Sequence, residues 1–297
     1  MITLSDLAAL HESYADDLAR SVAPVHVTDG VVIEDDGLPL LMGVVNLSRD
    51  STYRESIAGS TGAALHKARV QTAQGARIVD LGAEASNDDA DRVGPDEQIE
   101  KLLPVVEELS RHTAVSVETY RPAVVRAVLD AGARMINLTG REDEDEMLAA
   151  VAEHDATVLM CFGTSANVRE QDDLPRADDF APFLVDHFAE RIEHARSLGV
   201  EKIVVDPGMG FTFPNLGGIE RANLQTRTVT QNFRLRTLGV PTASVLPHNL
   251  DIFEDEFRKA EGFFTVFATL GRVSLLRVHE IPHVRTVLRA MEMLDVR

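Results

Sequence analysis

The sequence is poor in cysteine, in basic residues and in long apolar runs, and each shortage excludes a class of protein. A single cysteine, Cys161, cannot form a disulfide within the chain. Lys and Arg number 29 against 48 Asp and Glu, and the net charge of −19 argues against a nucleic acid or an anionic membrane as partner. No apolar run approaches the roughly 20 residues that cross a bilayer, and the N-terminal residues lack the apolar core of a signal peptide. These absences predict a soluble protein of the reducing cytoplasm.

Short β-rich runs alternate with longer segments of helical periodicity along most of the 297 residues. The β-rich runs are 41–46, 76–82, 114–118, 134–138, 157–162, 202–206, 241–246 and 274–278. Strands that are buried on both faces have continuous apolar sequences, so this alternation predicts parallel strands joined by helices. Eight such units favour one α/β domain over residues 31–297, a (β/α)8 TIM barrel. An open doubly wound sheet is the alternative, because a count of strands does not prove closure.

Residues 1–30 do not follow the alternation and are predicted to form an extension to the barrel. Residues 5–22 have an amphipathic helical pattern, and Ser5 or Asp6 is available as a cap near its start. The pair Asp29 and Gly30 suits a two-residue hairpin turn between two apolar segments. We therefore expect a helix followed by a hairpin that plugs the bottom of the barrel.

Polar residues follow the predicted strands, at the end of the barrel where active sites of this architecture form. They are Asn46, Asp80, Glu84, Glu118, Asn137, Cys161, Asp206, His248, Arg277 and His279. A single carboxylate after a strand is more often a helix cap or a turn residue. Four amide or carboxylate groups over one barrel mouth, however, need a ligand or water: Asn46, Glu118, Asn137 and Asp206. Such groups suit a flat heterocycle with an amidine-like edge, such as a 2-amino-4-oxo-pyrimidine ring.

Six motifs occur in a fixed order along the chain. They are MGVVNLSRDSTY (42–53), DLGAEASND (80–88), SVETYR (116–121), MINLTG (135–140), VDPGMGFTF (205–213) and RVHE (277–280). In order and spacing they resemble the dihydropteroate synthases, and more broadly the pterin-binding barrels, from about residue 40 to 290. The resemblance implies a TIM barrel that binds a reduced pterin or its diphosphate and joins it to an amine nucleophile.

The resemblance also implies which residues contact the pterin ring. Asp206 would accept hydrogen bonds from the exocyclic amine and a ring N–H, with Asn137 and Glu118 on neighbouring ring nitrogens. Phe211 would form an apolar wall, and His248 would partly replace a lysine of the family. Met160 would pack against the ring face, although a core methionine is an equally good interpretation.

A second group of residues resembles the family's anion site. Arg277 and His279 would hold the diphosphate, although Arg277 could instead pair with Asp80 or Glu118. Asn46 would lie near the diphosphate and its magnesium ion. With Asp50, these three residues, Asn46, Arg277 and His279, are the predicted catalytic groups. The resemblance further implies Mg²⁺ only alongside a diphosphate, no tightly bound cofactor, and a homodimer formed through the outer helices.

Two loops depart from the family pattern. Pro247–Asn249 stand where the family has a Ser-Arg-Lys signature that contacts the pterin and p-aminobenzoate. Ser86 and Asn87, followed by Asp88 and Asp89, replace a Thr-Arg pair, so negative charge takes the place of positive charge. The sequence therefore predicts a pterin-binding transferase with weak or redirected synthase activity. The alternatives are a non-catalytic pterin- or folate-binding partner or regulator, and a methyltransferase that uses a methylated folate.

Overall fold

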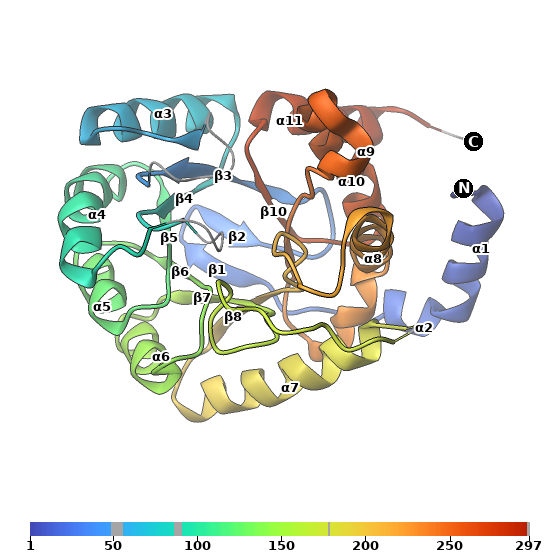
Figure 1. Cartoon of the computed structure of the whole chain (residues 1–297), viewed down its shortest axis with the longest axis horizontal. Coiled ribbons are helices and arrows are strands. Elements are labelled where there is room, and N and C mark those ends of the chain that lie inside the picture. The colour runs from blue at the N-terminus through green and yellow to red at the C-terminus, as the bar shows by residue number, and fades with distance from the viewer. Residues whose placement is uncertain (49–55, 86–90, 178, 296–297) are drawn as a thin grey trace.

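Eight parallel strands form a barrel at the centre of the computed structural model (Figure 1), which describes residues 1–48, 56–85, 91–177 and 179–295. The strands are β3 (Leu40–Asn46), β4 (Ile78–Gly82), β5 (Ala114–Thr119), β6 (Met135–Leu138), β7 (Thr157–Cys161), β8 (Lys202–Asp206), β9 (Ala243–Val245) and β10 (Leu275–Val278). Their order is β8-β7-β6-β5-β4-β3-β10-β9, and a parallel bridge between Val205 and Thr242 joins the two outer strands. The eight predicted strands are confirmed, and the bridge favours the barrel over an open sheet.

Helices cover the outside of the barrel and connect successive strands, as Figure 1 shows. They are α3 (Thr61–Gln74), α4 (Pro95–Leu109), α5 (Pro122–Asp130), α6 (Glu144–Glu153), α7 (Ala181–Ser197), α8 (Gly218–Thr230), α10 (Ala260–Leu270) and α11 (Ile281–Met293). Three shorter helical segments, η2 (Asn232–Leu238), α9 (Leu250–Phe253) and η3 (Glu254–Lys259), flank α8 and α10 in the sequence. In the described ranges, no helix combines the length and the apolar character needed to span a membrane.

Helix α4 illustrates how the sequence directs one face of each helix to the barrel. Pro95 occupies its first turn, where the missing N–H costs no hydrogen bond. Leu102, Val105, Val106 and Leu109 recur at helical spacing and are all buried. They belong to the main core cluster, which lies between strands β3 to β8 and the helices outside them. This packing fixes the strand ends from which the site residues project.

The N-terminal segment forms the predicted extension. Helix α1 (Leu4–Ser13) is capped by Thr3, whose side chain and backbone pair reciprocally with Asp6. The cap therefore lies two residues before Ser5 and three before Asp6, the two residues expected to provide it. A short helix α2 (Ala15–Leu18) follows. Strands β1 (Val25–Thr28) and β2 (Val31–Ile33) pair antiparallel, so the hairpin continues beyond residue 30.

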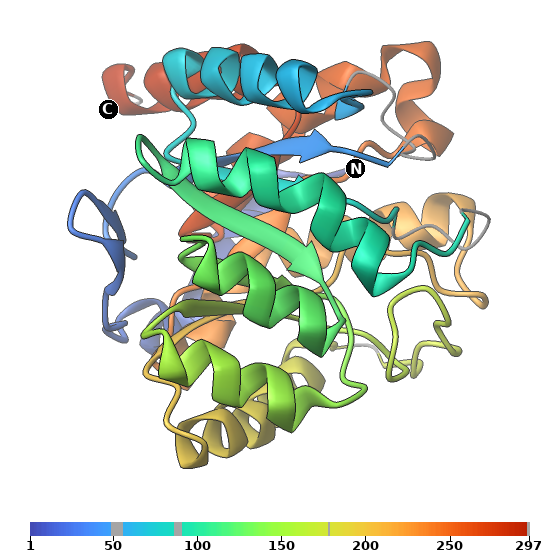
Figure 2. The same cartoon turned by 90° about the vertical axis from the view of Figure 1, so that its left-hand side faces the viewer.

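The hairpin closes the bottom of the barrel, as expected. Its inward residues, such as Val27 and Ile33, share a buried cluster with residues near the strand starts, such as Ile78 and Leu275. Figure 2 shows the hairpin, in blue, at the end opposite the long loops that follow the strands. The apolar plug therefore leaves the other end of the barrel as the open one.

Candidate active site

A cavity of about 290 Å³ opens at the C-terminal ends of the barrel strands. Its lining includes eight of the residues that the sequence analysis selected: Asn46, Glu118, Asn137, Asp206, Phe211, His248, Arg277 and His279. Asp50 and the loop residues Asn87 to Asp89 lie outside the described residues. The volume is close to the lower end of the range for small-molecule sites.

Asp206 ends strand β8 and is held by the turn that follows it. Its Oδ1 accepts a hydrogen bond from the Gly208 N–H at 2.7 Å, and its Oδ2 accepts one from the Val245 N–H at 3.2 Å. Gly208 has φ of 74°, and a Cβ there would lie 2.4 Å from the carbonyl oxygen of Phe162. Only glycine fits this turn, and the turn fixes the direction of the carboxylate.

Burial raises the pKa of Asp206 to about 6, although the two backbone donors and Arg277 act in the opposite direction. The carboxylate is therefore ionised at neutral pH, and its burial in the ionised form lowers the stability of the folded state. Each of its oxygens retains a lone pair for a further donor. A ligand with two adjacent N–H groups would match it.

Arg277, on β10, is bound to two protein carboxylates. Its Nε donates to Asp80 Oδ2 at 2.8 Å, and its Nη2 donates to Glu118 Oε2 at 2.5 Å. Burial alone would lower the pKa of Arg277, but Glu118 and Asp80 outweigh it and raise this pKa overall. The pairing that the sequence analysis gave as the alternative is thus present. An anion at this position would have to share the donors of Arg277 with two carboxylates.

Asn137 is oriented by neighbours at both ends of its amide. Its Nδ2 donates to Asp80 Oδ2 at 3.1 Å, and its Oδ1 accepts from the Cys161 thiol at 3.3 Å. Burial, with the charges of Asp206 and Glu118, raises the pKa of that thiol well above its usual value. Cys161 therefore acts here as a neutral donor rather than as a nucleophile.

Met160 does not line the cavity, so its predicted contact with a ring face is wrong. Side chains alternate along a strand, and on β7 this places Leu159 and Cys161 toward the barrel interior. Met160 points the other way and is fully buried in the core between strands and helices. The alternative interpretation, a core methionine, is the correct one.

His248 and His279 converge on a buried carboxylate that the sequence analysis missed. Glu261, in the first turn of α10, accepts from His279 Nδ1 at 2.9 Å, and its Oε1 lies 3.3 Å from His248 Nε2. Burial lowers the pKa of His279 despite this contact. Burial would raise the pKa of Glu261, but its hydrogen bonds, first those with the two histidines, lower it to about 2. No motif marks Glu261, because it lies on a helix and reaches the site only through the fold.

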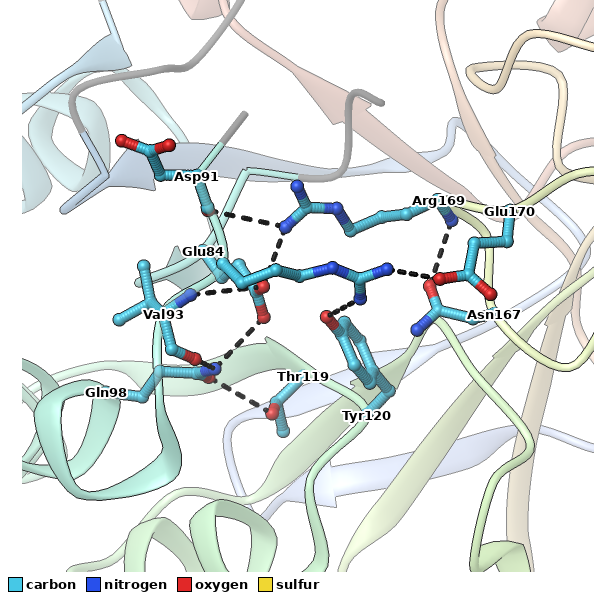
Figure 3. A network of polar contacts seen from close by, with 10 residues as sticks. Glu84, Asp91, Val93, Gln98, Thr119, Tyr120, Asn167, Arg169 and Glu170 are labelled. Carbon is cyan, nitrogen blue, oxygen red and sulfur yellow. Dashed lines mark hydrogen bonds and ion pairs between the residues drawn. The ribbon is translucent and has the colours of Figure 1, made fainter. Parts of the chain in front are cut away.

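A polar network borders the mouth between the loops after β4 and β7 (Figure 3). Arg169 Nη1 binds Glu84 Oε1 at 2.7 Å, and both side chains are almost fully buried. Gln98 Nε2 donates to the other oxygen of Glu84 at 3.1 Å. The loop residue Arg169 therefore neutralises Glu84, which removes that carboxylate from the set of ligand-binding candidates.

Two amide side chains complete the mouth. Asn46 lines the cavity, and its Nδ2 donates to Ser56 Oγ at 2.6 Å. Asn249 is buried, lines the cavity and has φ of 47°. Its Nδ2 has no hydrogen-bond partner among the described residues. The sequence analysis treated Asn249 only as a departure from the family pattern, whereas the structure places the residue in the cavity wall with its Nδ2 buried.

Comparisons with known proteins identify the family to which the chain is similar. The family described as "Pterin binding enzyme" matches residues 42–279. The dihydropteroate synthase of Escherichia coli K12 is 28% identical over 86% of this chain and 91% of its own length. That of Synechocystis is 28% identical over 81% of this chain and 85% of its own.

Solved structures agree with the sequence relatives. Xanthomonas albilineans dihydropteroate synthase with 4-aminobenzoic acid superposes with a TM-score of 0.76 at 25% identity, covering 93% of this chain and 100% of that one. The Thermus thermophilus enzyme in complex with 4-aminobenzoate gives a TM-score of 0.73 at 26% identity, covering 92% and 100%. Together with the family match over most of the barrel, these similarities show that the chain belongs to the pterin binding enzyme family, as a relative of the dihydropteroate synthases.

Proposed function

We propose that the protein binds a reduced pterin or its diphosphate at the barrel mouth and acts as a transferase with weak or redirected synthase activity. The proposal rests on the position of Asp206, whose buried carboxylate is fixed by a glycine turn and lines the cavity. A ring with an amine beside an N–H would supply two donors to it. The Xanthomonas albilineans enzyme, at 25% identity, has been solved in complex with 7,8-dihydropteroate, which supports a pterin site of this kind.

The remaining contacts of the ring follow from the groups around Asp206. Asn137 presents an oriented amide, Glu118 a carboxylate oxygen and Phe211 an apolar surface. Asn249 lines the cavity near the ring position, in the region where the resemblance leads one to expect a lysine. A neutral amide donor would replace a charged one there, which supports retained binding with less charge stabilisation.

The contacts that the site offers to a diphosphate are less favourable than those it offers to the ring. Arg277 would have to share its donors between phosphate and two carboxylates. His279 donates its Nδ1 proton to Glu261, so a neutral His279 presents only an acceptor at Nε2. A Mg²⁺ ion brought by a diphosphate would take the Asn46 carbonyl oxygen, together with phosphate oxygens and water. In this proposal Asn46, Asp50, Arg277 and His279 remain the catalytic groups.

The neutralised Arg277 also supports a second candidate function, a pterin- or folate-binding protein that transfers nothing or transfers a methyl group, since neither role needs a diphosphate.

Assembly as a homodimer is part of the proposal, and the exposed apolar residues Phe263 and Leu270 on α10 offer a surface for it. A cytoplasmic location is also proposed, because the buried thiol of Cys161 suits a reducing compartment.

Titration with a reduced 6-hydroxymethyl pterin tests the binding step, and the absence of tryptophan leaves the pterin fluorescence free of indole background. We expect binding at neutral pH that weakens below about pH 6, because a protonated Asp206 offers one acceptor fewer. Below that pH, the affinity for the pterin should fall by about tenfold per pH unit. Absence of binding at pH 7, or an affinity that is the same at pH 7 and pH 5, would contradict the proposal.

A further inference from the structure

We propose that His248, Glu261 and His279 form a binding site for a divalent transition-metal ion, with Zn²⁺ as the ion that suits these ligands. The site lies in the wall of the barrel mouth, on the side of Arg277. It goes beyond the proposed pterin binding, because metal affinity here does not depend on a pterin. It also differs from the Mg²⁺ position at Asn46, which needs a diphosphate.

The three donor atoms already lie close together. Glu261 Oε1 is 2.9 Å from His279 Nδ1 and 3.3 Å from His248 Nε2, and all the ligand atoms are within 4.8 Å of one another. Zinc held at its usual distances of about 2.0–2.1 Å separates tetrahedral ligands by roughly 3.4 Å. The triangle therefore needs only a small adjustment to accept the ion at its centre.

The chemistry of the donors selects the type of ion. Two imidazole nitrogens with one carboxylate oxygen suit zinc and its first-row neighbours, whereas Mg²⁺ prefers oxygen ligands alone. Two histidines and a glutamate are also the protein ligands of some catalytic zinc sites, in which a fourth position stays open. His248 and His279 both line the cavity, so that fourth position would face a bound ligand.

The support around Glu261 keeps its carboxylate in place for a metal. Its Oε2 accepts the backbone N–H of Glu280 at 2.9 Å, and the backbone N–H of His279 is shared between Oε1 at 3.0 Å and Oε2 at 3.2 Å. Such second contacts orient ligating carboxylates in metal sites. Metal binding at Oε1 would displace the His279 Nδ1 proton, which the same ring can carry at Nε2.

The electrostatic surroundings permit a cation. Arg277, the nearest described cation in the cavity wall, is neutralised by Asp80 and Glu118. Arg258 pairs with Glu280 at 3.6 Å, so the charges beside the site also balance. The chain as a whole carries a net charge of −19. A bound Zn²⁺ would place positive charge in the loop region where the family resemblance implies a lysine.

Zinc competition with a chromogenic chelator tests the site on the full chain, after removal of metals and without pterin. We expect one equivalent of Zn²⁺ to bind, Mg²⁺ not to compete, and Co²⁺ to give the intense visible bands of a four-coordinate site. His248→Ala, which changes a partly exposed loop residue, should lower the zinc affinity by roughly 100-fold or more, since even outer contacts cost 10- to 100-fold. His154→Ala is the matched control, because His154 pairs with Asp130 on the outer surface.

Glu261→Gln separates ligation from packing, because it keeps the shape of a fully buried side chain. The variant should lose zinc binding while its circular dichroism spectrum stays native. Absence of zinc binding to the wild type at micromolar zinc would overturn the proposal. So would equal zinc affinity in wild type and His248→Ala. Neither result bears on pterin binding, which is measured in a separate titration.

Discussion

Dihydropteroate synthase turnover by this protein is expected to be about 10⁴-fold below that of a relative such as the Escherichia coli enzyme, assayed side by side. Removal of one preorganised charge contact at a reacting centre typically costs about 10² to 10³ in rate. Two loops have lost such contacts. Pro247–Asn249 lack the arginine and lysine of the family, and Asn87–Asp89, which lie outside the described residues, bring acidic groups where the family has an arginine.

The structure gives a physical reason why these losses are not recovered nearby. The resemblance assigns Arg277 to the departing diphosphate, but Asp80 and Glu118 hold this side chain. His279 is committed to Glu261 through Nδ1. Asn249 brings only an uncharged side chain to the cavity wall. Ring binding can therefore survive while stabilisation of the leaving group is lost, which is the combination that lowers turnover more than affinity.

The assay uses 6-hydroxymethyl-dihydropterin diphosphate and p-aminobenzoate, with complementation of a strain that lacks its own synthase as the cellular readout. The relative from Escherichia coli serves as the positive control in both. Growth equal to that control, together with turnover of the same magnitude, would show that the altered loops are another solution to the same chemistry. The part of the proposal that concerns weak synthase activity would then be wrong.

Asp206→Asn is expected to weaken pterin binding by about 1.5–3 kcal/mol, the range for a hydrogen bond to a charged group. This corresponds to roughly 10- to 150-fold in the dissociation constant. Asparagine keeps one acceptor for the Gly208 N–H but presents a donor where the carboxylate had its second oxygen. The pH dependence of binding between pH 7 and 5 should disappear in this variant, which separates titration of the protein from titration of the ligand.

The same substitution should stabilise the fold at neutral pH. The pKa of Asp206 is about 6 in the folded state against 3.8 as its ordinary value, so the folded protein binds the proton more tightly than the unfolded chain. The contribution of Asp206 to wild-type stability therefore falls as pH rises from 4 to 6, by up to about 3 kcal/mol for two pKa units. Asp206→Asn should be more stable than wild type at pH 7 by the part of this amount that exceeds the loss of the hydrogen bond from the Val245 N–H, and no more stable at pH 4.

Calorimetric titration with the pterin and thermal unfolding at pH 4 and pH 7 measure these two effects. Asp130→Asn is the matched control, because Asp130 is an exposed aspartate that pairs with His154 away from the cavity. It should bind the pterin as the wild type does. An Asp206→Asn variant that binds as tightly as wild type, or that is less stable at pH 7, would remove Asp206 from its assigned role.

The sequence was sufficient to predict the barrel because each strand is a short apolar run between helical segments. The predicted runs correspond to strands β3 to β10 of the structure. It also located the mouth, since residues such as Asn137 and Asp206 stand at strand ends, where parallel strands place their side chains together. Met160 was assigned wrongly because a resemblance does not specify which face of β7 a side chain occupies, whereas the alternation does.

The pairing of Arg277 with Asp80 or Glu118 was given by the sequence only as an alternative to an anion site, and the other pairing partners of the site could not be predicted. Arg277 and Asp80 are nearly two hundred residues apart along the chain, and only the closed order of β4, β3 and β10 brings them together. Glu261 and Arg169 come from a helix and a loop without a motif, and both act by neutralising or orienting a residue that does have one. Such partners depend on tertiary packing rather than on local pattern.

A crystal structure of the protein with bound 6-hydroxymethyl-dihydropterin diphosphate tests the central claim most directly. The account predicts that the ring lies in the mouth with its amine and adjacent N–H within hydrogen-bond distance of Asp206, and with its carbonyl near Asn249. It further predicts that Arg277 keeps its contacts with Asp80 and Glu118, or gives up only the latter to a phosphate oxygen. A ring bound with that edge away from Asp206, or bound elsewhere on the chain while the mouth stays empty, would contradict the account.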